Sequence, residues 1–483
     1  ILHASPDEGD PSNFRRDGIY LLPETVSELR PVAGILTRGA GNPLSHVQLL
    51  ARNLGIPNVA VDASLVDALR QHDGQKVVLA VGRSGIVQLE EDGPRWEAAF
   101  GDGDGGTAGA LIRPDLEKLD LSVRDFLSLD DLRASDSGRI VGPKAAKLGE
   151  LRHHFPELTV PGVAIPFGLY REVVLEKPYH DTGKTVFEWM SAEFRKLEAL
   201  PRGSPGEEEA AESLRAEIYD LVRTTDPGPE FRRDLRAALA RELGPDFRGG
   251  VFVRSDTNVE DLPGFTGARI NLTLPNGVGF ESVMKALGEV WASAFSPRSF
   301  AWRRGNMTDP EHVYPAVLLL KTVPSDKSGV MVTQDLDTGD RAVLSLAVNE
   351  GAEGAVEGQA AETLRVDTRD GSVRLLSAAT APWRHVPVPT GGVVEQRTSG
   401  TEEVLEPEEI EQLVAFWKAL PDRFPPIVDA EGRPAAADVE FAFVDGKLFL
   451  LQIRPFNESA RARESLYLRE LDQGLRARLE GST

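Results

Sequence analysis

The chain of 483 residues contains no cysteine. It can therefore form no disulfide, no thiolate nucleophile and no zinc site with cysteine ligands. It also lacks an apolar run close to the roughly 20 residues that a membrane-spanning helix needs. No segment has the pattern of a signal peptide. We therefore expect a soluble, cytoplasmic protein.

Basic residues are in deficit. The chain has 54 lysines and arginines against 76 aspartates and glutamates, which gives a net charge of −22. Nucleic acids and anionic membranes bind basic surfaces, so we expect neither as a partner. A small phosphate ligand is not excluded, because a few convergent basic groups suffice for it. Since the chain begins with Ile1 rather than Met, we expect a piece of a longer protein.

The length predicts two to four domains, and an apolar fraction of 41% provides for large cores. Extended and helical patterns alternate over the first hundred residues, which predicts a small α/β unit. The Gly- and Asp-rich stretch 101–110 has no periodicity and predicts a flexible linker. The expected units are residues 1–100, a linker over 101–124, a first subdomain with a helical insert over 125–312, a second subdomain over 313–456, and a charged helical tail over 457–483.

One histidine stands at the start of a short predicted helix within residues 34–58. Ser45 is suited to the N-cap, and Gly55 to the position just past the last turn. His46 then lies among unpaired backbone N–H groups at the positive end of the helix dipole, which favours a phosphate. A capping or surface histidine fits the same pattern. The apolar residues of the predicted buried face recur at helical spacing: Val47, Leu50, Ala51 and Leu54.

Two further segments carry a basic residue suited to a phosphate. Lys144 opens a predicted helix after Gly142 and Pro143, although most lysines in such turns are merely solvated. Arg254 ends an apolar strand and could bind a phosphate through two N–H groups. The segment after it contains Gly264 and Gly267 and suits a mobile loop that covers phosphates.

The segment 437–455 predicts a β-hairpin with polar side chains on both strands. Asp438 and Glu440 share one face of the first strand, and Gln452 and Arg454 share one face of the second. A two-residue turn would put Glu440 and Gln452 on opposite faces, whereas a three-residue turn with a left-handed glycine would put them on the same face. We predict the three-residue turn.

On a common face, Glu440 and Gln452 would supply oxygen ligands for Mg²⁺, and Arg454 would neutralise a transferring phosphate. The spacing is equally compatible with a buried ion pair of Arg454 with Asp438 or Glu440. The hairpin alone does not decide between the two interpretations.

Together these segments resemble the phosphohistidine dikinases, the superfamily of phosphoenolpyruvate synthase, pyruvate phosphate dikinase, rifampicin phosphotransferase and the glucan and phosphoglucan water dikinases. Residues 34–58 are similar to the family's swivelling phosphohistidine segment. Several motifs in a consistent order are far more specific than any one of them. The segments similar to the family's ATP-binding domain, which has an ATP-grasp type of fold, are 141–162, 251–271, 324–339 and 437–455.

The resemblance implies a multidomain α/β and α+β fold, with a small swivelling phosphohistidine domain and two ATP-grasp-type subdomains. It implies that the β-phosphate of ATP passes to His46, that the γ-phosphate leaves as inorganic phosphate, and that AMP is released. ATP and Mg²⁺ are the implied cofactors. The implied site comprises His46 and Arg454 in catalysis, Lys144, Arg254, Gly264, Gly267, Val323 and Asp438 at the nucleotide, and Glu440 and Gln452 at Mg²⁺.

The histidine segment precedes the ATP-binding segments, an order that resembles the glucan water dikinases. This order implies a carbohydrate acceptor and an acceptor-binding region upstream of Ile1. One alternative is a phosphoenolpyruvate- or antibiotic-type phosphotransferase that acts on a small molecule and has its acceptor domain elsewhere. Another is a non-catalytic nucleotide-binding or regulatory module.

Several residues depart from the family pattern. Pro143 replaces a glycine and stiffens the turn before Lys144. Asp256 puts a carboxylate near the implied phosphates, which is unfavourable unless it helps to hold a metal. Arg269 stands where glutamine is frequent, and residues 320–321 (Leu-Lys) replace the Gln-Glu or Gln-Gln pair that faces adenine. These departures motivate the non-catalytic alternative.

Overall fold

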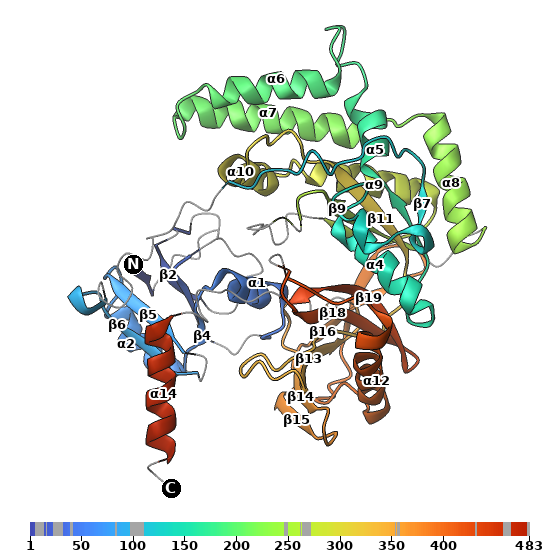
Figure 1. Cartoon of the computed structure of the whole chain (residues 1–483). Helices are drawn as coiled ribbons and strands as arrows, with labels where there is room; N and C mark the ends of the chain where they lie inside the picture. The colour runs from blue at the N-terminus through green and yellow to red at the C-terminus, as the bar shows by residue number, and fades with distance from the viewer. Residues whose placement is uncertain are drawn as a thin grey trace.

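The protein is a mixed helix and sheet molecule with several separate sheets, shown as a computed structural model in Figure 1. This confirms the predicted multidomain fold that mixes helices and sheets. The structure describes residues 1–4, 14–15, 17–22, 32–38, 42–82, 85–96, 111–245, 250–260, 262, 272–352, 354, 358–429, 432–456 and 465–480.

The N-terminal part contains a parallel four-stranded sheet with strand order β1-β2-β3-β4. Parallel strands need crossover connections, and α1 (His46–Leu54) is the crossover between the last two strands. A short helix, α2 (Val66–Arg70), and an antiparallel ribbon complete this part. The strands are β1 (Leu2–His3), β2 (Ile19–Leu22), β3 (Gly34–Thr37), β4 (Asn58–Ala60), and the ribbon pair β5 (Val77–Val81) and β6 (Val87–Glu91).

Helix α1 begins and ends where the sequence predicts. The Ser45 side chain accepts a hydrogen bond from the Gln48 N–H at 3.4 Å. Gly55 adopts a left-handed φ of 67°, and its N–H caps the carbonyls of the last turn. Ala51 packs into the core of the N-terminal sheet, as predicted for the buried face. The side chains of His46, Val47 and Leu50 lie outside the described part of the chain.

The second part contains an antiparallel five-stranded sheet with strand order β10-β9-β11-β8-β7. Buried apolar residues fill β11, because this strand is central and covered on both faces. Within the segment predicted as a linker, Ile112 is buried against Met307, and Leu119, Leu121 and Val123 are partly buried against the core of this part. The predicted linker segment 101–110 lies outside the described residues. The strands are β7 (Leu127–Ser128), β8 (Gly162–Ile165), β9 (Val251–Thr257), β10 (Thr273–Gly277) and β11 (Pro315–Lys321).

Helices cover this sheet. Three successive helices, α6, α7 and α8, lie within the segment for which the sequence predicts a helical insert. Helix α9 packs an apolar face into the core, with Val283, Leu287 and Val290 buried. The helices are α4 (Pro143–His154), α5 (Phe167–Tyr170), α6 (Val186–Glu198), α7 (Pro205–Thr224), α8 (Pro229–Leu243), α9 (Phe280–Ser293) and α10 (Pro297–Asn306).

The third part is an antiparallel six-stranded sheet with strand order β15-β14-β13-β12-β18-β19. Helix α12 (Pro407–Arg423) contacts its outer strand β19, and a second ribbon pairs β16 (Trp383–Pro387) with β17 (Val393–Arg397). The sheet strands are β12 (Lys327–Val332), β13 (Val343–Glu350), β14 (Glu362–Asp367), β15 (Val373–Ser377), β18 (Ala436–Val444) and β19 (Lys447–Phe456).

Helix α1 bridges the N-terminal part and the six-stranded sheet. Leu44 and Leu49 are buried and belong to an apolar cluster formed mainly by the third part. The Arg52 guanidinium donates to the Leu336 carbonyl at 3.0 Å and lies 3.6 Å from the Asp337 carboxylate. Figure 1 accordingly shows α1 beside β18 and β19. The partners of Leu44 and Leu49 in the cluster are Val330, Val332, Leu336, Ala347, Ala361, Ala436 and Phe456.

The last described element is α14 (Leu466–Glu480), a helix within the segment predicted as the tail. It lies beside the N-terminal β5–β6 ribbon rather than beside the sheet that precedes it in the chain (Figure 1). Among the described residues, no helix combines the length and the apolar character that crossing a membrane requires.

Candidate active site

A single arginine connects the five-stranded sheet to the six-stranded sheet. Arg254 lies on β9, and its Nη2 donates to the side-chain oxygens of Gln452 at 3.0 Å and Glu440 at 3.4 Å. Its Nη1 donates to the Leu451 carbonyl at 3.3 Å. The guanidinium, the carboxylate and the amide that the sequence singles out therefore meet at one point. All three side chains are largely buried.

The β18–β19 hairpin brings Glu440 and Gln452 together in a different way from the one predicted. Val444 pairs with Lys447, so the turn has two residues, and Asp445 (φ 49°) and Gly446 (φ 70°) are both left-handed. This is the geometry of a two-residue hairpin turn, and the predicted three-residue turn is wrong.

A β-bulge restores the common face. Glu440 pairs with Gln452 but Phe441 pairs with Leu450, which leaves Leu451 as the extra residue on β19. One extra residue moves every following side chain to the other face of a strand. The bulge thus turns Gln452 toward Glu440, and it also frees the Leu451 carbonyl that Arg254 contacts.

Helix α1 lies on the same face of the six-stranded sheet. Val330 pairs with Glu440 and Val332 pairs with Asp438, and directly paired residues point to the same side. The two valines belong to the cluster that receives Leu44 and Leu49. The helix that begins at His46 is therefore seated on the face that carries the two carboxylates.

Arg454 forms an ion pair with Asp438. Its Nε donates to Asp438 Oδ2 at 2.7 Å, as one of the two interpretations of the hairpin predicts. Burial raises the pKa of the Asp438 carboxyl, and the charge of Arg454 opposes this effect. The second carboxylate oxygen, Asp438 Oδ1, is buried without a hydrogen-bond partner. An unpaired buried carboxylate oxygen has a free site for a cation or a donor.

The donor set at this face suits a hard cation. Asp438 Oδ1, the Glu440 carboxylate and Gln452 Oε1 are oxygen donors, which Mg²⁺ prefers. Within the described part of the chain, no group of three or more His, Asp and Glu side chains could hold a metal. A magnesium ion here would therefore depend on additional ligands from phosphate and water, as Mg²⁺ at nucleotide sites commonly does.

The start of helix α4 is occupied by a carboxylate from the neighbouring strand. Asp256 Oδ1 accepts from the Lys144 N–H and Oδ2 from the Ala145 N–H, both at 2.9 Å. A Cβ on Gly142 would lie 2.3 Å from Asp256 Oδ1, so this approach requires glycine. Burial first, and then the charge of Glu260, raises the pKa of Asp256 to about 7. Asp256 therefore serves as the cap of α4.

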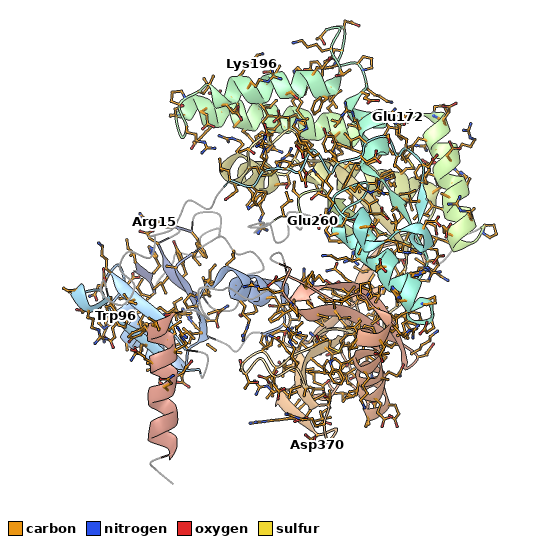
Figure 2. The ribbon with its side chains drawn as sticks, viewed as in Figure 1. Arg15, Trp96, Glu172, Lys196, Glu260 and Asp370 are labelled. Atoms are coloured by element: carbon orange, nitrogen blue, oxygen red, sulfur yellow. The ribbon has the colours of Figure 1, made fainter. Side chains whose placement is uncertain are left out.

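The Lys144 ammonium is held beside this cap. Its Nζ donates to the Ser255 carbonyl at 3.0 Å and forms an ion pair with Glu260. Glu260 also accepts from the Thr257 N–H at 2.7 Å, which fixes the carboxylate in the turn after β9 (Figure 2). Glu260 is not among the residues predicted from the sequence, although its place three residues after Thr257 is a usual spacing for a side chain that caps a turn.

The remaining predicted residues are more scattered. Val323 is buried in the turn after β11, where its carbonyl accepts from the Ser325 N–H at 2.8 Å. Leu320 is buried in the core and Lys321 is exposed at the end of the strand. Gly264, Gly267 and Arg269 lie outside the described residues, so the predicted phosphate-covering loop is not described.

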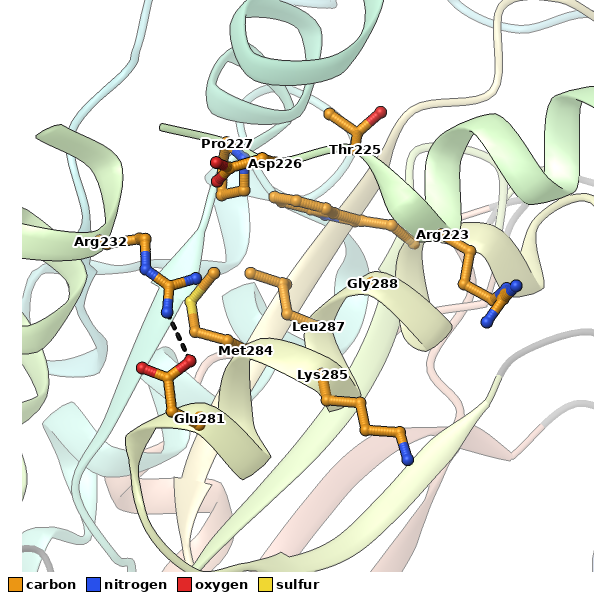
Figure 3. A pocket seen from close by; sticks show the side chains of 11 residues that line it. Arg223, Thr225, Asp226, Pro227, Arg232, Glu281, Met284, Lys285, Leu287 and Gly288 are labelled. Atoms are coloured by element: carbon orange, nitrogen blue, oxygen red, sulfur yellow. Dashed lines mark hydrogen bonds and ion pairs between the residues drawn. The ribbon is translucent and has the colours of Figure 1, made fainter. Parts of the chain in front are cut away.

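A hollow of about 330 Å³ lies elsewhere, between the end of α7, the start of α8 and one side of α9. None of the predicted site residues lines it. In Figure 3 the charged ends of Arg223 and Lys285 point away from it, and Arg232 is paired with Glu281. Its lining comprises Arg223, Thr225, Asp226, Pro227, Arg232, Glu281, Met284, Lys285, Leu287, Gly288 and Trp291.

Comparison with known proteins gives one family match, described as "Pyruvate phosphate dikinase, AMP/ATP-binding domain", over residues 138–473. A rifampicin phosphotransferase of Streptomyces sp. is 28% identical over 345 residues, which are 69% of this chain and 36% of the relative. A probable phosphoenolpyruvate synthase of Methanothermobacter thermautotrophicus is 27% identical over 356 residues, which are 71% of this chain and 48% of the relative.

A phosphoenolpyruvate synthase of Aeropyrum pernix is 33% identical over 222 residues, which are 45% of this chain and 25% of the relative. The chain thus spans less than half the length of these curated relatives. The matched region includes the segments that carry Lys144, Arg254 and the β18–β19 hairpin, whereas the segment of His46 precedes it.

Proposed function

Because the chain belongs to the pyruvate phosphate dikinase AMP/ATP-binding family, we propose that it binds ATP between its two larger sheets and transfers a phosphoryl group to His46. The observation that carries this proposal is the contact of Arg254 with Glu440 and Gln452. It joins the two sheets at the face on which the helix of His46 is seated. Residues 125–312 and 313–456 are then the two subdomains of an ATP-grasp-type nucleotide-binding domain.

The proposed reaction transfers the β-phosphate of ATP to the imidazole of His46. The imidazole forms a bond to the β-phosphorus, while the bond between the α- and β-phosphates breaks and AMP is released. Water takes the γ-phosphoryl group, so the bond between the β- and γ-phosphates breaks and inorganic phosphate is released. Phosphoryl transfer of this kind depends mainly on positioning and on stabilisation of charge. The chain supplies both, through cations from two sheets and a histidine on a docked helix.

Each basic residue has a separate part in this scheme. Arg254 binds phosphate oxygens from the five-stranded sheet, and Arg454 contacts the transferred group. Lys144 reaches a phosphate as a point charge once its pairing with Glu260 is exchanged for the nucleotide. Val323 and Asp438, with Gly264 and Gly267 of the covering loop, complete the proposed nucleotide contacts.

Glu440 and Gln452 are the proposed ligands of Mg²⁺, and the unpartnered Asp438 Oδ1 beside them supports a cation at this face. When bound, the ion would neutralise phosphate charge. The residues of the chain orient the site: Arg254 holds Glu440 and Gln452 at fixed distances, and Arg454 holds Asp438.

Residues 1–100 form the proposed swivelling domain, and the segment 101–110 is its proposed linker. The acceptor of the phosphohistidine is a small molecule or a carbohydrate. A glucan acceptor rests only on the order of the domains and gains no support from the relatives found. A phosphoenolpyruvate- or antibiotic-type acceptor is compatible with the names of those relatives.

The test is incubation with ATP labelled at the β-phosphate, followed by separation of nucleotides and of protein. We expect AMP, inorganic phosphate and a protein label that is lost in acid. His46→Ala should abolish the label, whereas His72→Ala, which changes an exposed histidine of the same part of the chain, should retain it. An acid-stable label, or release of ADP alone, would contradict the proposal.

A non-catalytic nucleotide-binding module is the second candidate. The observation that favours it is the Asp256 carboxylate, which occupies the backbone N–H groups at the start of α4 that a phosphate would otherwise use. Binding of ATP by calorimetry without formation of AMP would support this candidate over the first.

A further inference from the structure

The C-terminal helix α14 packs against the N-terminal part of the chain. The Tyr467 hydroxyl donates to Gln88 Oε1 on β6. The Tyr467 ring lies edge-on to the Trp96 indole, with the ring centroids 5.2 Å apart. Trp96 is only 3% exposed, and it lies beside α14 (Figure 2). An edge-to-face arrangement is favourable for a pair of aromatic rings, because the positive ring edge meets the negative ring face.

A second contact follows farther along the helix. A Cβ built on Gly82, which follows β5, would lie 2.3 Å from Asp472 Oδ1 and 3.1 Å from its Cγ. The Asp472 side chain therefore lies against the backbone at Gly82, and a larger residue at position 82 would have to displace the Asp472 carboxylate. Two contacts, at Tyr467 and at Asp472, fix the direction of α14 along the ribbon.

The strand that precedes α14 ends at the docking surface of α1. Phe456, the last residue of β19, belongs to the cluster that receives Leu44 and Leu49. From there the chain reaches Ser465 at the start of α14. The N-terminal part thus contacts the third part through α1 and the C-terminal helix through its ribbon.

We propose that α14 is a component of the histidine-bearing body. This body then comprises residues 1–96 together with residues 465–480, and it has two covalent links to the rest of the chain, at 97–110 and at 457–464. The ribbon β5–β6 with Trp96 is the surface that receives the helix. In this proposal the helical tail expected from the sequence contains α14, which completes the first domain.

The shorter link limits how far the body can travel. Nine peptide units separate Phe456 from Ser465, and a fully extended chain covers at most about 32 Å over that number of residues. Fifteen units separate Trp96 from Leu111, which allow at most about 54 Å. If His46 delivers phosphate as proposed above, the acceptor must lie within reach of the shorter link, or α14 must leave the ribbon. This last consequence alone depends on the proposed function.

The absence of cysteine makes a direct test possible. In the Gly82→Cys/Asp472→Cys double variant the two sulfurs should meet, since a disulfide needs Cβ atoms only about 3.8 Å apart. We expect an intrachain disulfide after mild oxidation, seen by mass spectrometry of the non-reduced digest. The matched control, Gly82→Cys/Glu470→Cys, places the second cysteine at an exposed position of α14 and should remain reduced.

Three outcomes would overturn the proposal: no disulfide in the first variant, equal oxidation of both variants, or a disulfide found only between two chains. A second measurement covers the case in which the double variant does not fold. Tyr467→Ala should speed hydrogen exchange in β6 at least several-fold relative to Tyr467→Phe, which keeps the ring. Unchanged exchange would contradict the packing.

The consequence for function is measured separately, by the labelling of His46. If the unmodified protein labels His46, the oxidised Gly82→Cys/Asp472→Cys variant should label it equally well, because α14 travels with the histidine. Loss of labelling that is recovered on reduction would show that α14 must leave the ribbon before transfer. If the unmodified protein is never labelled, the proposed function fails while the disulfide result stands.

Discussion

The Nη2 atom of Arg254 lies 3.0 Å from Oε1 of Gln452, although 198 residues separate them in the chain. Through this contact and the one to Glu440, β9 and the β18–β19 hairpin form one site from two sheets. The side chains that the proposed reaction requires are thus held by hydrogen bonds rather than by proximity in sequence.

Replacing Arg254 should separate the two sheets at the site. Lysine keeps the charge but cannot make three directed contacts, so we expect Arg254→Lys to slow AMP formation by roughly 10²–10³-fold. Arg236→Ala, which alters an exposed arginine on α8, is the control and should change the rate little. Steady-state AMP release is the measurement, with circular dichroism to verify the fold. A lysine variant with unchanged rate would remove Arg254 from the site.

The bulge at Leu451 can be tested by altering the length of the hairpin. Insertion of one alanine after Leu451 should turn Gln452 away from Glu440 and abolish AMP formation, because a shift of one residue exchanges the faces of a strand. Deletion of Leu451 should instead give a regular hairpin in which Gln452 still pairs with Glu440 on the common face, so part of the activity should remain. Leu451→Ala keeps the register and is the control. Full activity in the insertion variant would contradict the role of the bulge.

Asp256 should make stability depend on pH. Burial, followed by the charge of Glu260, raises the pKa of Asp256 from the ordinary value of 3.8 to about 7, so between about pH 4 and 7 the folded protein holds a proton that the unfolded chain releases. The free energy of unfolding therefore falls as the pH rises through this window. Asp256→Asn should remove this contribution. The melting temperature of the variant, relative to that of the unmodified protein, should therefore increase as the pH rises from 4 to 7. The exposed Asp181→Asn should not change the profile.

The docking of α1 should depend on Arg52. Its contacts to Leu336 and Asp337 are partly exposed, and such pairs contribute at most about 1 kcal/mol, or a few-fold in a docking equilibrium. We expect Arg52→Glu and Asp337→Arg each to slow the labelling of His46 a few-fold, more at low than at high salt. The charge-exchanged double variant should recover part of the rate. Equal rates in all variants would show that the apolar contacts alone hold the helix.

Local features of the site could be predicted from the sequence. Helix α1, with Ser45 and Gly55 at its ends, follows from spacing and capping preferences that act within a few residues. The placement of Glu440 and Gln452 on one face was also correctly predicted, but for the wrong reason. The deciding bulge has no local signature, because a leucine at position 451 fits a regular strand equally well.

Contacts between distant segments could not be predicted. Asp256 accepts from the N–H of Lys144, 112 residues earlier in the chain, so from the sequence alone its carboxylate indicates a conflict with phosphate rather than a helix cap. Leu49 does not belong to the predicted buried face of α1, and it is buried only because the helix also packs against the six-stranded sheet. An apolar residue on the opposite side of a predicted amphipathic helix was the one available signal of this docking.

The packing of Tyr467 on Trp96 also has a consequence for biosynthesis. A ribosome completes the first sheet of this protein long before it produces the helix that covers the β5–β6 ribbon. The indole of Trp96 therefore remains uncovered while the two larger sheets are being made, and a chaperone could recognise it in that interval. For the same reason, a premature stop codon just ahead of α14 should damage the N-terminal end of the protein more than the neighbouring C-terminal sheet.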